Sequence, residues 1–195
     1  MRIGAAIVAI VAALSLFVQW QVSSALMTGA DASAVAWRML GSFTVLGNLA
    51  TVLILLRAVI RRKIRARRAV MITVVMGIIG LGYHLLLAGV WAHQGLAWWA
   101  DQGLHTAVPV LVVLWWLTFA PKDGLKWYDA VRWLIWPVLY ADYALVRGLA
   151  SGFYPYPFMD ISVLGAAEVV INVGILLTAF LALGLLLVAV ARVIR

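Results

Sequence analysis

The sequence predicts an all-α integral membrane protein, a bundle of six transmembrane helices with both termini in the cytoplasm. Of its 195 residues, 66% are hydrophobic and only 11% are charged, whereas soluble domains are about half apolar and a quarter charged. The apolar residues form stretches of about twenty, which is the length of helix that crosses the hydrocarbon of a bilayer. These stretches lack the period-two alternation of barrel strands, so helices are the remaining way to pair every backbone group.

Six apolar stretches follow one another along the chain, with no long linker and no sequence repeat between them. Each reaches or nearly reaches the length of a membrane span. The first also has a rival interpretation as a secretory signal peptide, but its apolar run is longer than a typical signal core. We therefore expect one transmembrane domain over residues 1–195, with spans at 3–27, 36–60, 69–92, 104–120, 128–149 and 162–191.

The basic residues determine the predicted orientation. Seven of them lie between Arg57 and Arg68, in the short connection between the second and third spans. This position favours a cytoplasmic loop that faces anionic lipid headgroups over a nucleic-acid-binding segment. With both termini inside, only Arg38 and Arg147 lie toward the outside, which agrees with the positive-inside rule.

Polar side chains gather at one predicted depth, in the outer half of the bundle. At 1.5 Å per residue, most of them lie within roughly 12 Å of the outer boundary. Polar groups are costly in hydrocarbon, so such a layer is more often functional than not. Its members, from five spans, are Thr44, Asn48, His84, His105, Asp142, Arg147 and Glu168.

Each polar residue also has a purely structural interpretation. Thr44 can bond a carbonyl of its own helix, His105 can cap the start of the fourth span, and His84 can be a packing histidine. The charged residues can form two structural ion pairs, Asp142 with Arg147 and Glu168 with Arg38.

A threonine and a histidine form the simplest hydrolytic pair that this layer offers. A neutral imidazole can take the proton of a hydroxyl near neutral pH, which makes the hydroxyl a nucleophile. The chain has no Gly-x-Ser-x-Gly motif and no cysteine, which excludes the nucleophile elbow of α/β-hydrolases and thiol chemistry. Candidates to orient the histidine are Asp142 and Glu168; candidates to bind an oxyanion or a carboxylate are Asn48, Arg38 and Arg147.

Three other functions are compatible with the same residues. A metal site would use His84, His105, Asp142 and Glu168, but no HExxH or HxxxH spacing supports it, and we expect neither a metal nor a cofactor. A small proton-coupled transporter would use the buried carboxylates as relays, although no internal duplication is visible. A non-enzymatic lipid-binding membrane protein would use the polar layer only to hold its helices together.

Four stretches of the chain resemble the androgen-induced family of multi-pass membrane hydrolases, and in particular its bacterial members. They are SFTVLGNL (42–49), LHTAVPVLVVLWW (104–116), PKDGLKWYDAVRWLIWPVLYADYALVRG (121–148) and GFYPYPFMDI (152–161). They occur in order and extend the resemblance over nearly all of the chain beyond the first span.

The resemblance implies a threonine hydrolase that acts on lipid esters. The animal members of that family cleave fatty acid esters of hydroxy fatty acids, with a threonine in the second span and a histidine near an outer helix start. Matched by motif, Thr44 is the expected nucleophile and His105 the expected base. A bacterial member is expected in the inner membrane, where a fatty acid ester enters the site from the outer leaflet.

Overall fold

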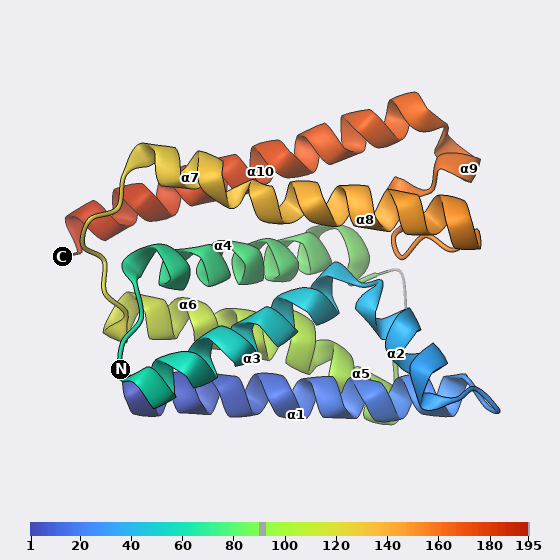
Figure 1. Cartoon of the computed structure of the whole chain (residues 1–195), viewed down its shortest axis with the longest axis horizontal. Helices are drawn as coiled ribbons and strands as arrows, with labels where there is room; N and C mark the ends of the chain where they lie inside the picture. Colours follow the sequence, from blue (N-terminus) through green and yellow to red (C-terminus); the bar gives the residue numbers. More distant parts are fainter. Residues whose placement is uncertain (90–92, 195) are drawn as a thin grey trace. The chain divides into compact units, whose positions relative to one another are not determined.

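The computed structural model describes residues 1–89 and 93–194, and every regular element within those ranges is a helix (Figure 1). The predicted all-α class is therefore confirmed, while residues 90–92 of the predicted third span lie outside the described residues. Five helices in the described ranges are long and apolar enough to cross a membrane: Arg2–Leu26, Phe43–Arg61, Ala66–Leu87, Gly95–Phe119 and Ala166–Val193. The chain divides into two compact units, Met1–Gly124 and Leu125–Arg195, and each is described by itself.

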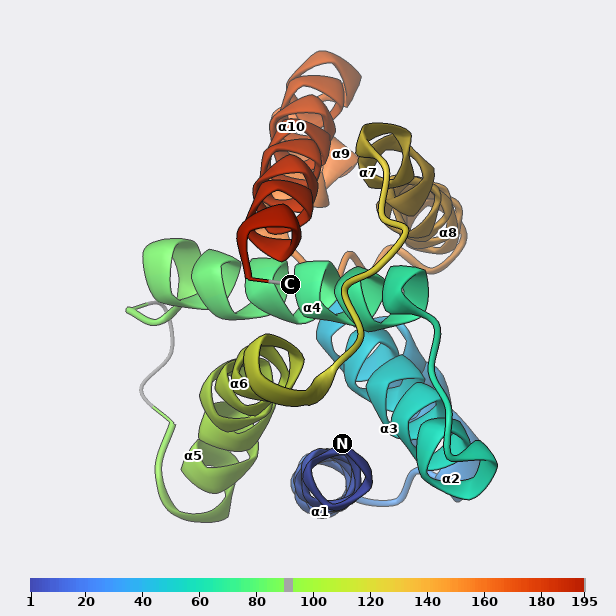
Figure 2. The ribbon, with the colours of Figure 1, turned by 90° about the vertical axis from the view of Figure 1, so that its left-hand side faces the viewer.

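The first unit is a bundle of four long helices that run alternately in opposite directions. Helices α1, α3, α4 and the continuous helix α5–η2–α6 form a ring in which α3 and α6 each contact both α1 and α4 (Figure 2). Helix α4 runs obliquely across the end-on view, whereas α1 points toward the viewer. The elements are α1 (Arg2–Leu26), α2 (Ala32–Leu40), α3 (Phe43–Arg61), α4 (Ala66–Gly82), η1 (Tyr83–Leu87), α5 (Gly95–Gln102), η2 (Gly103–Ala107) and α6 (Val108–Phe119).

The predicted second span, 36–60, starts too early. Residues 32–40 form the separate short helix α2, which Asp31 caps by accepting a hydrogen bond from the backbone N–H of Ala34 at 2.8 Å. The backbone becomes extended at Ser42, and α3 begins at Phe43. A glycine followed by serine favours such a break, because glycine is a weak helix former and serine is a good residue to precede a helix. Thr44 therefore lies in the first turn of α3 rather than two turns inside a longer helix.

The predicted fourth span, 104–120, also has the wrong start. The helix begins at Gly95 and continues without interruption to Phe119. The stretch before residue 104 contains Asp101 and Gln102, and such polar residues are typical of a loop, but Asp101 is turned into the bundle and is buried. His105 consequently lies in the middle of a long helix and does not cap a helix start.

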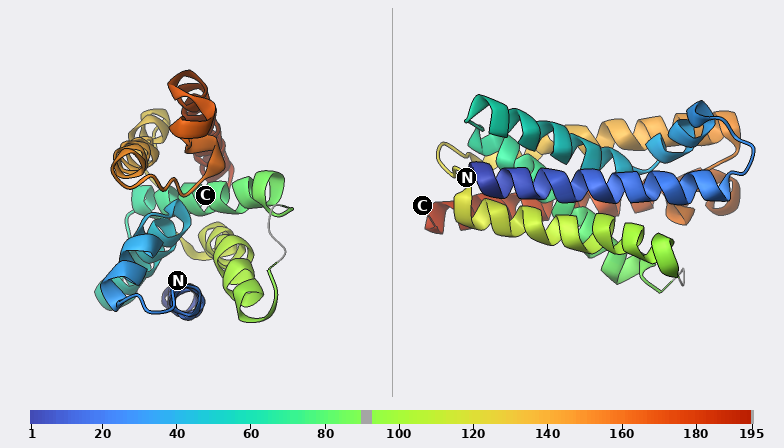
Figure 3. Two further views of the ribbon diagram at one scale, coloured as in Figure 1. Left: turned by 90° about the vertical axis from the view of Figure 1, so that its right-hand side faces the viewer. Right: turned by 90° about the horizontal axis from the view of Figure 1, so that it is seen from below.

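The second unit contains α7 (Trp127–Trp133), α8 (Ile135–Ser151), η3 (Pro157–Met159), α9 (Ile161–Leu164) and α10 (Ala166–Val193). The predicted fifth span, 128–149, is broken at Leu134 into α7 and α8, so it is not one continuous helix. Pro137 explains the break, because proline cannot donate to the carbonyl of Trp133 four residues earlier and its ring collides with that carbonyl. Helices α7 and α10 pack together, and both are visible in the second unit in Figure 3.

The predicted sixth span, 162–191, is interrupted near its start. Gly165 adopts a positive φ of 78°, which ends α9 and lets α10 begin at Ala166. Glu168 therefore lies in the first turn of α10, where it is exposed, and not about two turns inside a span. A carboxylate at this position interacts favourably with the positive end of the helix dipole.

One glycine in the first unit allows two helices to approach very closely. A Cβ at Gly103, in η2, would lie 2.4 Å from the Oγ and 2.9 Å from the Cβ of Ser15 in α1. Those distances are far inside van der Waals contact, so no larger residue fits without moving a helix. Gly103 thus sets how close η2, and His105 with it, lies to the rest of the bundle.

We predict that Gly103→Ala destabilises the protein by about 1–3 kcal/mol, because the added methyl group overpacks the contact with Ser15. The measurement is thermal unfolding of the purified protein in detergent. The matched control is Gly82→Ala, since Gly82 is also helical but a Cβ there meets nothing within 4 Å. The control should change stability by less than about 1 kcal/mol.

A second substitution tests the cause of the effect. Ser15→Gly removes both atoms that the new methyl group would meet, so the double variant should recover much of the stability lost by Gly103→Ala. Equal unfolding temperatures for Gly103→Ala and Gly82→Ala would show that the close approach is not a constraint.

Candidate active site

The hydroxyl of Thr44 and the ring of His105 are in contact inside the first unit. Thr44 Oγ1 lies 3.2 Å from His105 Nε2, although the two residues are 61 positions apart in the sequence. Thr44 is only 6% exposed. Helix α3 brings the hydroxyl from one side and the π-helical turn η2 brings the imidazole from the other.

The second ring nitrogen of His105 is held by Asp101, one turn earlier on the same helix. Nδ1 lies 3.0 Å from Asp101 Oδ1 and 3.1 Å from the backbone carbonyl oxygen of Asp101. Both of these atoms are acceptors, so Nδ1 must be the nitrogen that carries the proton. In the neutral imidazole Nε2 is then unprotonated and accepts the hydrogen bond of the Thr44 hydroxyl. The arrangement is a hydroxyl, an imidazole and a carboxylate in series.

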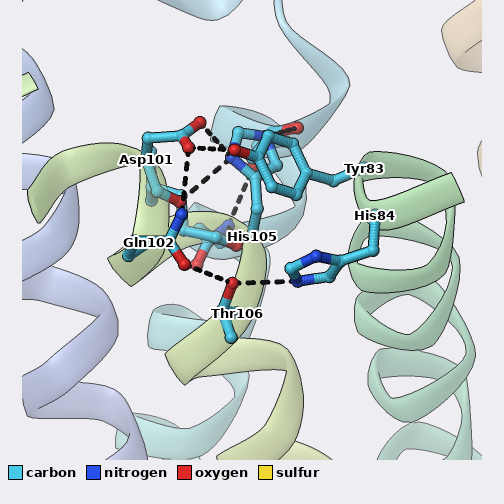
Figure 4. A network of polar contacts seen from close by, with 9 residues as sticks. Tyr83, His84, Asp101, Gln102, His105 and Thr106 are labelled. Carbon is cyan, nitrogen blue, oxygen red and sulfur yellow. Dashed lines mark hydrogen bonds and ion pairs between the residues drawn. The ribbon is translucent and has the colours of Figure 1, made fainter. Parts of the chain in front are cut away.

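The carboxylate of Asp101 is buried but well supplied with donors (Figure 4). The Tyr83 hydroxyl donates to Oδ2, and the side-chain amide of Gln102 donates to the same oxygen over a longer distance of 3.4 Å. A buried carboxylate is tolerated when hydrogen bonds replace its lost hydration. These donors therefore stabilise the charged form of Asp101 beside His105.

Tyr83 also fixes the plane of the imidazole. Its ring is stacked on that of His105, with centroids 4.4 Å apart and an angle of 14° between the planes. Tyr83 thus touches both members of the Asp101–His105 pair, through its hydroxyl and through its ring. An imidazole held in one plane keeps Nε2 directed at the Thr44 hydroxyl, which is the orientation that proton transfer requires.

Asn48 connects the two helices that carry the pair. It is fully buried, and its side-chain amide donates to the carbonyl oxygen of Thr44 at 2.9 Å and to that of Leu104 at 3.4 Å. Both donor positions are thus used by the backbone, so Asn48 is not placed as an oxyanion donor. Its position instead ties α3 to η2 next to Thr44 and His105.

His84 lies beside the site and joins it through two other side chains (Figure 4). Its Nε2 is 3.0 Å from the hydroxyl of Thr106, which donates to Gln102 Oε1 at 2.9 Å. Since the hydroxyl proton is already used, His84 Nε2 must be the donor, so the neutral His84 carries its proton on Nε2. The two histidines therefore have opposite tautomers.

An apolar groove of about 310 Å³ opens at His105 and His84. Apart from these histidines and Thr106 it is lined by glycine, proline and aliphatic side chains of α4 and α6, among them Gly77, Val110 and Val113. The His105 side chain is 19% exposed, and His105 lines this groove. The two helices approach closely at the groove, since a Cβ at Gly80 would meet Pro109 at 3.1 Å and the carbonyl oxygen of His105 at 3.4 Å.

Four further candidates from the sequence are described within the unit that holds each of them. Arg38 is exposed in α2. Asp142 and Glu168 are exposed in the second unit, and Arg147 is buried there and donates to the Tyr143 hydroxyl at 2.9 Å. The proposed pairing of Glu168 with Arg38 joins two units that are described separately. Among the described residues, no group of three or more His, Asp or Glu side chains could hold a metal ion.

Asp101 and Tyr83 are not among the residues that the sequence predicted for the site. Asp101 had a usable signal, because an aspartate four residues before a histidine lies on the same face of a helix. That signal was lost when the fourth span was started at residue 104. Tyr83 had none, since only the tertiary structure brings its hydroxyl to Asp101 and its ring to His105.

No protein-family model, curated protein or solved structure matches the chain.

We predict that the neutral form of His105 carries its proton on Nδ1 and that of His84 on Nε2. The reason is that Asp101 offers two acceptors to Nδ1 of His105, while Thr106 offers an acceptor to Nε2 of His84. Nitrogen-15 NMR of histidine-labelled protein distinguishes the tautomers, with His84→Gln and His93→Gln used for assignment. A proton found on Nε2 of His105 would contradict the arrangement described here.

Proposed function

We propose that this chain is an intramembrane lipid-ester hydrolase in which Thr44 is the nucleophile and His105 the general base. The observation that supports it most is the unbroken series from Thr44 Oγ1 to His105 Nε2 at 3.2 Å and from His105 Nδ1 to Asp101 at 3.0 Å. A nucleophile, a base and a group that orients the base are the parts that acyl transfer through a covalent intermediate needs.

The proposed reaction has two halves. Thr44 Oγ1 attacks the ester carbonyl carbon while its proton passes to His105 Nε2, and the tetrahedral intermediate then expels the alcohol, which takes that proton. In the second half, water attacks the acyl-threonine and gives a proton to His105 Nε2. Collapse of this intermediate breaks the acyl–oxygen bond, returns the proton to Thr44 Oγ1 and releases the carboxylic acid.

Two features support stabilisation of the charges that this reaction creates. The charged imidazolium of His105 forms next to the Asp101 carboxylate, which is the stabilising interaction of a catalytic triad. Thr44 lies in the first turn of α3, where the positive end of the helix dipole favours negative charge on nearby oxygen atoms. The N-terminal end of α3 is thus the proposed source of oxyanion stabilisation, in place of Asn48.

The apolar groove supports a lipid as the substrate. It lies between helices that are long and apolar enough to cross a membrane, and its wall is almost entirely aliphatic apart from the polar groups around His105. We infer that an acyl chain occupies the groove with its ester carbonyl at Thr44. The resemblance to the androgen-induced family leads us to propose a fatty acid ester, such as an ester of a hydroxy fatty acid, as the substrate.

The proposed location is the bacterial inner membrane, with both termini cytoplasmic. At one end of the first unit, the Trp115 indole donates to the carbonyl oxygen of Met1 at 3.3 Å, so α1 starts where α6 ends. The basic connection between α3 and α4 lies at this same end because successive helices reverse direction (Figure 1). The proposal takes this end as cytoplasmic and takes α7 with α8 as a broken fifth span.

We expect Thr44→Val and His105→Gln each to lower ester hydrolysis by about a hundredfold or more, because each removes one partner of the proton transfer. Asp101→Asn should cause a loss of similar size, since an amide that donates to Nδ1 moves the ring proton to Nε2. The measurements are hydrolysis of a long-chain ester by purified protein and covalent labelling by a fluorophosphonate. Thr44→Ser, which keeps the hydroxyl, is the matched control and should still be labelled.

Fluorophosphonate labelling of Thr44→Val at the level of the wild-type protein would show that Thr44 is not the nucleophile. A wild-type protein that neither labels nor hydrolyses esters would favour the lipid-binding alternative, in which the cluster only holds helices together. Substrate-dependent proton flux in liposomes would instead favour the transporter.

The groove leads to a separate prediction about the length of the acyl chain in the ester substrate. Val113→Trp should fill the groove and lower hydrolysis of long-chain esters at least tenfold more than that of short-chain esters, because only long chains need the filled space. Leu117→Trp is the control, since Leu117 is on the same helix but does not line the groove. The ratio of kcat/KM for long and short esters is the measurement, and an unchanged ratio in Val113→Trp would place the acyl chain elsewhere.

A further inference from the structure

A second pocket lies at the other end of α3 from Thr44, where α3 turns into α4. Its volume is about 670 Å³, and many of the side chains that line it are basic. Five basic side chains line it: Arg57, Arg61, Lys63, Arg65 and Arg68. Helix α3 is 19 residues long, which places this pocket about 28 Å from the start of the helix that carries Thr44.

The turn between the helices has the backbone geometry that brings these cations together. Arg62 follows the last residue of α3 and has a left-handed conformation, with φ 56° and ψ 18°. It is the one residue other than glycine with a positive φ among the described residues. Such a conformation is uncommon for arginine and reverses the chain within a short connection. Ile64, only 8% exposed, anchors the turn.

The positive charges of this pocket are not balanced by acidic side chains of the residues that the structure describes. None of its five cations forms an ion pair with an acidic side chain in the described part of the chain. Like charges that share one pocket repel one another, and an anion bound among them removes that repulsion. Arginine side chains in particular suit the planar, paired hydrogen bonds of a phosphate group.

Apolar side chains complete the pocket and identify the kind of anion. Ile54 and Met71 line the pocket about one turn farther along α3 and α4 from the connection than Arg57 and Arg68, and Ala58 lies between Arg57 and Arg61. A ligand that fits both surfaces has a phosphate at one end and hydrocarbon at the other. A free inorganic phosphate would use only the cations.

We propose that this pocket is a binding site for a single anionic phospholipid, with its phosphate held by the five cations and its glycerol and proximal acyl carbons against Ile54 and Met71. The phospholipid site is separate from the proposed ester-hydrolase site, so this proposal does not depend on the hydrolase function. A lipid bound there would hold α3 and α4 together at the end of the bundle opposite to Thr44.

The sequence offers a control that separates a specific site from a general attraction to anionic membranes. Arg62 belongs to the same basic segment as Arg61 but does not line the pocket. If the segment acts only through its total charge, then removing either arginine has the same effect. If the pocket is a site, then Arg61 matters far more than Arg62.

The test is native mass spectrometry of the full-length protein released from nanodiscs of phosphatidylcholine with a small fraction of phosphatidylglycerol. We expect wild-type protein to retain one phosphatidylglycerol in preference to phosphatidylcholine. Arg61→Gln and Arg65→Gln should each weaken that retention about tenfold or more, because each removes a charge-assisted hydrogen bond to the phosphate. Arg62→Gln should weaken it no more than about fivefold, as expected for one charge near the surface.

Competition with soluble anions distinguishes a lipid from a free phosphate. Inorganic phosphate and glycerol phosphate, added at millimolar concentration, should fail to displace the retained lipid because they lack the hydrocarbon that contacts Ile54 and Met71. Displacement by either anion at that concentration would overturn the assignment to a lipid. Equal losses in Arg61→Gln and Arg62→Gln, or equal retention of the two lipids by wild-type protein, would overturn the site itself.

Discussion

Burial of one carboxylate inside an apolar bundle is the constraint around which the first unit is organised. Asp101 is only 7% exposed, in a helix long and apolar enough to cross a membrane. A charge in that position must be surrounded by donors, and they come from His105 and Gln102 on its own helix and from Tyr83 after α4. Once Asp101 holds the proton of His105 on Nδ1, Nε2 can only accept, and Thr44 is the donor that it meets.

Both histidines of this cluster lie in π-helical turns, η1 and η2, which interrupt otherwise regular helices. In each turn a backbone N–H bonds to the carbonyl five residues earlier, as between Ala88 and Tyr83 at 2.8 Å. A π-helical turn widens the helix locally and redirects the side chains around it, and such turns occur frequently at functional sites. Here they direct Tyr83 and His105 toward one another, so that their rings stack.

The first unit has different polar chemistry at its two ends. The side-chain polar atoms of the Thr44–His105–Asp101 series all have hydrogen-bond partners within the first unit. The pocket between α3 and α4 is the opposite case, with five cations and no acidic partner in the described part of the chain. The proposed hydrolase site therefore needs no ligand to be stable, whereas the proposed phospholipid site has unbalanced charge that a bound anion neutralises.

The sequence by itself determined the helical class and the long apolar helices, because hydropathy is a local property that a stretch of about twenty residues displays on its own. Because polar groups are rare in such stretches, the sequence also indicated a polar layer, and the family resemblance selected Thr44 and His105 within it. The helix starts at Phe43 and Gly95 were missed. A hydropathy pattern does not show that a helix is interrupted at a glycine, and it does not distinguish a buried polar residue in a helix from a polar residue in a loop. The break that divides the fifth span into α7 and α8 was also missed, although Pro137 in that span is a residue that interrupts helices. Only the tertiary structure decided that Asp101 and Tyr83 support His105 while Asn48 ties the helices together, because these contacts depend on how closely and at what rotation separate helices pack.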